Sequence, residues 1–509
     1  MEITGENLTV DNVYRVATAN AADCQVTLST SALAKMQTAR DYVLKTVAAG
    51  KPVYGINTGF GALSDKFIQK NDLEQLQINL IRSHCTGVGD PLDRDTTRAL
   101  ILLRANCLAS GFSGINPELV QRLLDFLNHD LLPIIPKQGS VGASGDLAPL
   151  AHMSLALIGE GEVTYQGKLM PANDALKAIG KKSLHLGPKD GLALINGTAF
   201  MAAFACLAIS RTYNLMKAAD ISAILTLEGV KGSTKAYSPL ISKLKPHPGQ
   251  LDCVANLNQL LSHSEILESH KDCSKVQDPY SLRCVPQVHG ACRQTLYHAM
   301  DVAATEINSV TDNPLVFVAE DQVLSGGNFH GEALAFCMDY LAMGVSEIAN
   351  ISERRIEKMM NKTFSELPPF LTPESGINSG FMIAQVTAAA LVSENKTLCH
   401  PASVDSIPTS TDKEDHVSMG PIAGRKLMQV INNTTYCLAI ELMCAAQAIE
   451  FHRPLKSSAA IEAVMKLIRT HVAPLKDDRV LSPDINALTK LIQSGELVAT
   501  VEAITGALR

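Results

Sequence analysis

Long helical patterns fill the second half of the chain and limit the folds open to it more than any other feature. Apolar residues recur at helical spacing through segments rich in Ala, Leu and Met, at 199–227, 289–309, 331–361, 376–397, 424–450 and 457–470. Several of these segments exceed the mean globular helix of about 11–12 residues. Because long helices gain most of their stability by packing side by side, we expect a mainly α fold with a long central antiparallel helical bundle.

Composition agrees with such a bundle and excludes several classes of partner. Hydrophobic residues make up 46% of the 509-residue chain and aromatic residues only 5%, so aliphatic side chains must fill a large interior. The net charge is −7 and no segment is strongly basic, which argues against nucleic acid as a partner. The twelve cysteines form no C-x-x-C pair, as expected of a protein in a reduced, cytoplasmic compartment.

Two uncharged windows, 191–210 and 375–393, are long enough to raise the question of a membrane span. Both contain Asn, Gly, Thr or Ser among many alanines, so we expect buried helices of the bundle and no membrane partner. The first ten residues, MEITGENLTV, include acids and no apolar run, so a secretory signal is not expected.

A break after the helical pattern at 96–110 predicts a domain boundary, because GFSGINP at 111–117 interrupts the periodicity. We expect an N-terminal domain over 1–110 that carries the loop of Tyr54 and also His84. A larger helical domain over 111–509 would follow.

A glycine-rich stretch at 139–149, GSVGASGDLAP, does not suit the interior of a helix or strand. Asp146 could cap the helix that follows it. A phosphate-binding loop would need a lysine that this stretch does not have. The G-x-S-x-G motif of a nucleophile elbow is not matched either, because Asp146 stands where the motif has its second glycine. A third interpretation is self-modification. The Gly145 nitrogen would attack the Ala143 carbonyl carbon, and loss of water from Ser144 would leave an electrophilic alkene on a five-membered ring.

Polar clusters interrupt the helical patterns at their ends. They read YGINTGFG at 54–61, SH at 83–84, ING at 195–197, QDPYSLR at 277–283, GNFHG at 327–331 and EDHVSMG at 414–420. Each has a structural explanation as well. Asn196 and Thr198 could cap a helix, 277–283 could be a solvated turn, and Glu414 could be a first-turn acid.

Together with GSVGASGDLAPLAHM, these motifs resemble, in the same order, those of the aromatic amino-acid ammonia-lyase family. The resemblance implies that Ala143-Ser144-Gly145 forms 4-methylidene-imidazol-5-one autocatalytically, with no metal or diffusible cofactor. His84, Pro279 and Glu414 resemble the members that convert L-histidine to trans-urocanate and ammonia, the first step of histidine degradation. The resemblance also implies a homotetramer whose active sites combine residues from different subunits.

The resemblance implies a role for each site residue. The catalytic set would be Tyr54, Ala143, Ser144, Gly145, Tyr280 and Glu414, and the substrate-binding set His84, Asn196, Gln277, Arg283 and Phe329. Tyr54 would take the β-proton in an environment that favours its ionised form. Arg283 would hold the substrate carboxylate, and Asn196 would hold the ring oxygen or the substrate's polar head. His84 and Glu414 would meet the imidazole.

Several alternatives stay open at this stage. The substrate's amine or its imidazole could add to the electrophile. The chain could be a tyrosine or phenylalanine ammonia-lyase, an aminomutase of the same family, or a helical scaffold without catalysis. Lys413 and His289 depart from the family pattern, and Cys85 beside His84 raises the question of redox sensitivity.

Overall fold

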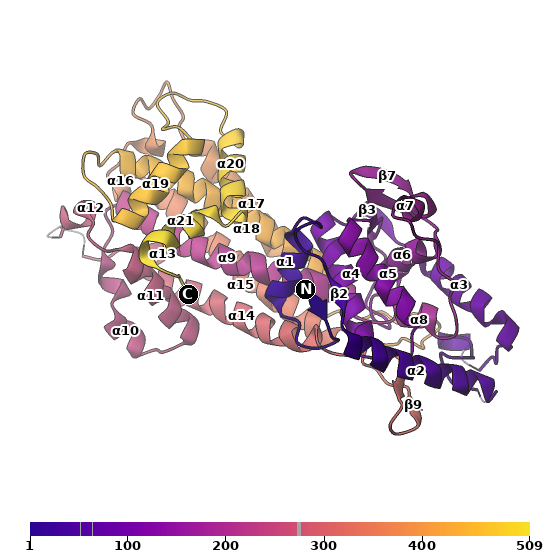
Figure 1. The fold of residues 1–509 in the computed structure, drawn as a ribbon. Coiled ribbons are helices and arrows are strands. Elements are labelled where there is room, and N and C mark those ends of the chain that lie inside the picture. Colours follow the sequence, from indigo (N-terminus) through magenta and orange to yellow (C-terminus); the bar gives the residue numbers. More distant parts are fainter. Residues whose placement is uncertain (51, 64, 272–275) are drawn as a thin grey trace. The chain divides into compact units, whose positions relative to one another are not determined.

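The computed structural model describes residues 1–50, 52–63, 65–271 and 276–509 (Figure 1). The chain divides into two compact units, each built from three segments. Unit 1 comprises Met1–Ser210, Ala299–Asp339 and Pro401–Arg425, and unit 2 comprises Arg211–His298, Tyr340–His400 and Lys426–Arg509.

Unit 1 combines helices of 6 to 19 residues with small sheets. Its helices are α1 (Val10–Thr18), α2 (Thr30–Ala48), α3 (Leu73–His84), α4 (Arg94–Ala109), α5 (Pro117–His129), α6 (Ala148–Leu155), α7 (Ala172–Ala178) and α8 (Asp190–Ile195), with 3-10 turns η1 (Gly61–Leu63), η2 (Lys70–Asp72) and η3 (Ala156–Ile158). Its strands are β1 (Glu2–Ile3), β2 (Thr27–Leu28), β3 (Val88–Pro91), β4 (Leu132–Pro133), β5 (Pro136–Gln138), β6 (Glu162–Tyr165), β7 (Lys168–Pro171), β8 (Leu315–Phe317) and β9 (Gln322–Leu324). β1 pairs with β2 in parallel, whereas β3–β5, β4–β6–β7 and β8–β9 are antiparallel.

Helix α4 explains why unit 1 continues past the boundary that we predicted at residue 110. Nearly every residue of α4 is buried, which is typical of a helix covered on all sides. It packs against α1 before the boundary and α5 after it. Arg98 of α4 strengthens this packing, because its guanidinium donates to the Leu127 carbonyl at 2.9 Å and to Asp130 at 2.7 Å.

Unit 2 consists of helices joined by loops, and none of the strands of the described residues lies in it. Its own helices are α10 (Pro239–Lys243), α11 (Pro248–Leu260), α12 (Glu265–Glu268), α13 (Tyr280–Arg283), α16 (Lys362–Ser365), α17 (Met382–Leu398), α19 (Ala459–His471), α20 (Ser482–Gln493) and α21 (Glu496–Thr505), with η4 (Thr234–Tyr237) and η5 (Pro369–Leu371). Four long helices have residues in both units: α9 (Ala199–Gly229), α14 (Val285–Glu306), α15 (Glu332–Met360) and α18 (Gly420–Glu450). The predicted mainly α fold is therefore confirmed.

The long helices form a bundle within unit 2, and successive ones alternate in direction. Helix α14 runs antiparallel to α15, with His289 near Arg355 and Thr295 against Gly344. Helix α17 likewise runs antiparallel to α15 and α18. Helix α18, however, lies alongside α15 in the same direction. The bundle is thus antiparallel between consecutive helices and also contains parallel neighbours.

Buried charges tie these helices together and account for His289, which departs from the family pattern. His289 Nδ1 lies 2.8 Å from Asp220 Oδ1, and Arg293 donates to the other Asp220 oxygen at 2.7 Å. Arg355 pairs with Glu441, and all of these side chains are buried. Because removing one partner would leave an uncompensated buried charge, we interpret His289 as part of a structural network.

The two windows that raised the membrane question differ in burial. Residues 191–209 are buried, as predicted. The other prediction is wrong in part: α17 begins only at Met382, and it exposes Ile383 (64%) and Val386 (51%) on one face. By length and composition alone, α9 and α15 could cross a membrane, but 78% and 67% of their most apolar windows is buried inside the protein.

Candidate active site

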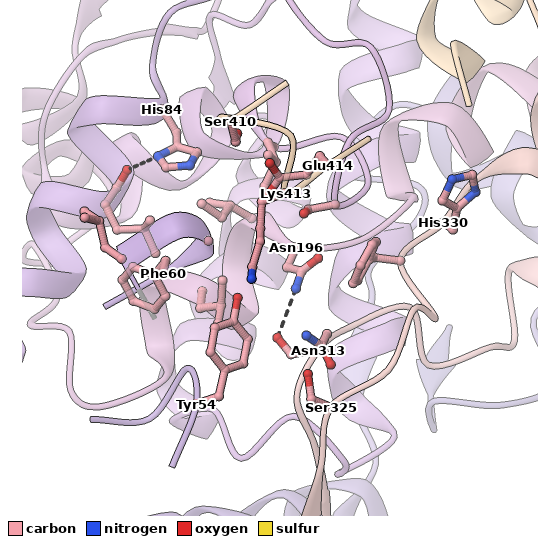
Figure 2. A pocket seen from close by; sticks show the side chains of 18 of the residues that line it. Tyr54, Phe60, His84, Asn196, Asn313, Ser325, His330, Ser410, Lys413 and Glu414 are labelled. Carbon is pink, nitrogen blue, oxygen red and sulfur yellow. Dashed lines mark hydrogen bonds between the residues drawn. The ribbon is translucent and has the colours of Figure 1, made fainter. Parts of the chain in front are cut away.

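A cavity of about 670 Å³ in unit 1 brings together many of the predicted site residues (Figure 2). Its lining includes Tyr54, His84, Ser144, Asn196, Phe329 and Glu414. Three short helices that pack on one another, α3, α6 and α8, frame one part of it. They place His84 at the end of α3, Ser144 ahead of α6 and Asn196 at the end of α8.

The glycine-rich stretch forms a tight left-handed turn that holds Ser144 at the cavity. Ser144 has φ +51° and Gly145 φ +79°. Gly145 forms a bridge with Gly197, and a Cβ on Gly145 would lie 2.2 Å from the Gly197 carbonyl oxygen. Asp146 N donates to that oxygen at 2.7 Å. The contact therefore requires glycine at position 145.

Asp146 caps a different helix from the one that we expected. Helix α6 begins after Leu147 without a side-chain cap. Instead, Asp146 Oδ2 accepts a hydrogen bond of 2.6 Å from Phe200 N, in the first turn of α9. Complete burial raises the pKa of Asp146 well above its usual range. The cap links the glycine turn to a long helix far along the chain.

His84 presents one ring nitrogen as an acceptor. Its Nδ1 lies 2.8 Å from the Leu80 carbonyl oxygen, which can only accept, so Nδ1 carries the proton. Nε2 is left with its lone pair. Burial lowers the pKa of His84, although the charge of Glu414 acts in the opposite direction. At neutral pH the neutral form of His84 is therefore favoured.

Glu414 is the second acceptor in the cavity. A short hairpin positions it, since Thr409 N donates to the Glu414 carbonyl at 2.9 Å. Its carboxylate Oε2 is buried and has no hydrogen-bond partner among the described residues. Lys413, on the same hairpin, also lines the cavity, and Figure 2 shows its side chain pointing toward the Tyr54 hydroxyl.

Tyr54 differs from its expected state. Burial raises the pKa of Tyr54, and the charge of Glu414 raises it further, while a hydrogen bond with the Gly61 backbone lowers it. The expectation that this environment favours the phenolate is therefore wrong for the chain alone. The neutral phenol is the stable form at neutral pH.

Asn196 has a free acceptor atom in the site. Its Nδ2 donates to the Asn313 carbonyl at 2.9 Å, as Figure 2 shows. Its Oδ1 is buried without a hydrogen-bond partner among the described residues. An unpaired buried oxygen is costly, so a donor from a bound molecule would stabilise it.

Five predicted site residues are not among those that line this cavity. Ala143 and Gly145 flank Ser144 in unit 1, whereas Gln277, Tyr280 and Arg283 lie in unit 2. Gln277 and Tyr280 are exposed, Tyr280 by 70%. The Arg283 guanidinium lies 4.5 Å from the centroid of the Tyr280 ring. The structure also places His330 and His416 in the cavity lining, and sequence reasoning gave them no role. Their signal was present, since each lies inside a motif, GNFHG and EDHVSMG.

Comparisons with known proteins define the class. The model of the aromatic amino acid lyase family matches residues 8–470. The chain therefore belongs to the aromatic amino acid lyase family.

Among its relatives, a histidine ammonia-lyase of Stigmatella aurantiaca is 50% identical over 505 residues, which cover 99% of this chain and 98% of the relative. The crystal structure of histidine ammonia-lyase from Trypanosoma cruzi matches with a TM-score of 0.92 and 42% identity, over 99% of this chain and 95% of that one. Tyrosine aminomutase from Streptomyces globisporus matches with a TM-score of 0.94 and 36% identity over 100% of both chains.

Proposed function

We propose that this chain is a histidine ammonia-lyase that removes ammonia from L-histidine to give trans-urocanate, and that it works in the cytoplasm. The observation that carries the proposal is the pair of acceptors, His84 Nε2 and the Glu414 carboxylate, in one cavity with Ser144. An imidazole that is protonated offers two N–H donors, one for each acceptor. A phenyl ring offers neither, and a phenol offers only one.

We propose that Ala143-Ser144-Gly145 forms 4-methylidene-imidazol-5-one. Such a group would supply the electrophile that no ordinary side chain offers. Three features of the chain support it. The left-handed turn at Ser144 and Gly145 brings small residues together, Gly145 leaves no Cβ in the way, and Asp146 anchors the end of the turn to α9.

The unpaired acceptors of the cavity support a mode of substrate binding. Asn196 Oδ1 would accept from the substrate's amino group, which favours the polar-head role over the ring-oxygen role. His84 and Glu414 would accept from the imidazole and stabilise its protonated form. A positive ring withdraws electrons from the neighbouring β-carbon, so its proton becomes easier to remove.

Tyr54 would take that β-proton. Its raised pKa makes the phenolate scarce at neutral pH, so a nearby cation would help. Lys413 lines the same cavity, and its side chain extends toward Tyr54 in the view of Figure 2, so in our proposal it would stabilise the phenolate.

Gln277, Tyr280 and Arg283 would reach the cavity from other subunits of a homotetramer. The exposed ring of Tyr280 with Arg283 stacked on it and the exposed apolar face of α17 support such an assembly. Arg283 would then hold the substrate carboxylate. The prediction is that activity disappears upon dilution to monomers. Activity that persists in a protein shown by light scattering to be monomeric would exclude active sites shared between subunits.

Substrate tests separate this proposal from a tyrosine or phenylalanine lyase, an aminomutase and an inactive scaffold. Purified protein is incubated separately with L-His, L-Tyr and L-Phe, and products are followed by absorbance and chromatography. We expect urocanate from L-His alone and almost no turnover by Ser144→Ala. The peptide containing 143–145 should be lighter by two waters in the wild-type protein and unchanged in Ser144→Ala. The absence of urocanate with an intact ring would overturn the choice of substrate, and an unmodified peptide in active protein would overturn the electrophile.

A further inference from the structure

A second group of side chains in unit 1 has the composition of a metal site. His330, Glu332 and His416 each offer a ligand atom, and these atoms all lie within 4.8 Å of one another. His330 precedes α15, Glu332 is its first residue, and His416 precedes α18. We propose that these three side chains bind a divalent transition-metal ion, with Zn²⁺ as the best fit.

The hydrogen bonds of His330 leave the right nitrogen free. Its Nε2 lies 3.3 Å from the His416 carbonyl oxygen, which can only accept, so Nε2 carries the proton in the neutral ring. Nδ1 then has its lone pair free. A carbonyl that fixes the tautomer in this way is the usual partner of a metal-binding histidine.

Glu332 supplies an oxygen that lacks a donor. Its Oε2 is buried and has no hydrogen-bond partner among the described residues. The same oxygen lies 3.9 Å from His330 Nδ1, so in the neutral state two acceptors face each other with no hydrogen between them. A cation bound to both would remove this mismatch.

His416 completes the set. Its ring centroid lies 5.6 Å from that of His330, with 35° between the ring planes. His416 is exposed, so its ring can turn toward a metal at little cost. Ligands about 2.1 Å from a tetrahedral Zn²⁺ lie about 3.4 Å apart. The ligand atoms, which lie within 4.8 Å of one another, would therefore have to approach by up to about 1.4 Å. Two histidines and one carboxylate leave a fourth position open to water.

Another His–Cys–Asp group shows why composition alone does not make a metal site. Asp220, Cys253 and His289 in unit 2 also lie close together. Both oxygens of Asp220 already accept hydrogen bonds, one of them from Arg293, whose positive charge would oppose a second cation. Glu332 has no such competitor among the interactions described above.

The position of the site gives it a consequence. His330 and His416 line the same cavity as Ser144, and Figure 2 shows His330 on the side away from His84 and Tyr54. A hydrated metal ion there would occupy part of the cavity and slow entry of a small molecule. We therefore expect Zn²⁺ to inhibit reversibly, without any part in the proposed reaction.

Metal binding itself is the test, because it does not depend on the proposed activity. The intact protein is titrated with Zn²⁺ by calorimetry and with Co²⁺ by visible spectroscopy, at pH 7.5 and 5.5. We expect one ion per chain at pH 7.5, weaker binding at pH 5.5 because protons compete with the metal for its ligands, and a Co²⁺ spectrum without a thiolate charge-transfer band.

His416→Ala and Glu332→Gln should each weaken binding by at least about tenfold. The matched control is His185→Ala. His185 is exposed and has one carboxylate neighbour, Glu74 at 2.9 Å. Its replacement should leave the affinity of the protein for Zn²⁺ unchanged. Circular dichroism checks that each variant is folded. Three results would each overturn the site. They are the absence of stoichiometric metal binding, wild-type affinity for Zn²⁺ in folded His416→Ala and Glu332→Gln, and a thiolate charge-transfer band in the Co²⁺ spectrum.

Discussion

Replacing Gly145 with alanine tests whether the turn at Ser144 depends on close backbone packing. Gly145 has φ +79°, and its new Cβ would lie 2.2 Å from the Gly197 carbonyl oxygen. Left-handed backbone costs an L residue about 1–2 kcal/mol, and an extra methyl in a packed interior costs about 1–3 kcal/mol more. We expect Gly145→Ala to reduce the free energy of local opening by about 2–5 kcal/mol, the sum of these two ranges.

Gly167 provides the matched control. It has φ +73° in the turn between β6 and β7, and no atom of the described residues lies within 4 Å of its Cβ position. Gly167→Ala should therefore cost only the backbone contribution, about 1–2 kcal/mol. The difference between the two variants isolates the contact with Gly197.

Hydrogen exchange measured by mass spectrometry provides the assay. Peptides that cover 139–149 and 195–200 should exchange faster in Gly145→Ala, and the peptide that covers 162–171 should exchange faster, by a smaller factor, in Gly167→Ala. The mass of the 143–145 peptide tells whether the two waters are still lost. Equal protection in Gly145→Ala and the wild type would refute the packing argument, whatever happens to the ring.

Three further predictions concern the charges around the cavity. The value of kcat/KM should rise with pH as Tyr54 ionises. Glu414→Gln should move this rise to lower pH, because it removes a charge that raises the pKa of Tyr54. An unchanged pH profile in Glu414→Gln would contradict this coupling between Glu414 and Tyr54. Lys413→Gln should move the same rise to higher pH and Lys413→Arg should restore it, as a stopped assay over a pH series would reveal. Burial raises the pKa of Cys85 to about 11, so iodoacetamide at pH 8 should leave Cys85 in the native protein largely unmodified, and rapid labelling of its peptide would show a reactive thiol.

The sequence predicts the long helices well because their stability depends on a repeated apolar pattern. The segment predicted at 199–227 is α9 (Ala199–Gly229), and that at 331–361 is α15 (Glu332–Met360). The pattern predicts a helix that begins at 376, but α17 begins at Met382. The pattern records which residues are apolar and not what covers them, so the exposed face of α17 could not be predicted.

The candidate site is likewise predictable from the sequence only in part. Motifs far apart in sequence identified Tyr54, His84 and Glu414, and the fold brings them to one cavity. The helix capped by Asp146 could not be read from neighbouring residues, because the acceptor and its donor, Phe200 N, are 54 positions apart. The raised pKa of Tyr54 also depends on burial and on Glu414, which only the folded chain supplies.

Glu414 has two opposing effects in the proposed mechanism, and the substrate reconciles them. Its carboxylate selects an imidazole, yet its charge raises the pKa of Tyr54 and makes the base scarce. When a protonated imidazole donates to Glu414, the positive ring offsets that charge at the moment when the base is needed. The pKa of Tyr54 would then fall on binding of L-histidine and not on binding of a neutral ring. Such a site would discriminate substrates through the ionisation of its base as well as through contacts, because only the correct ring would prepare Tyr54 for proton transfer.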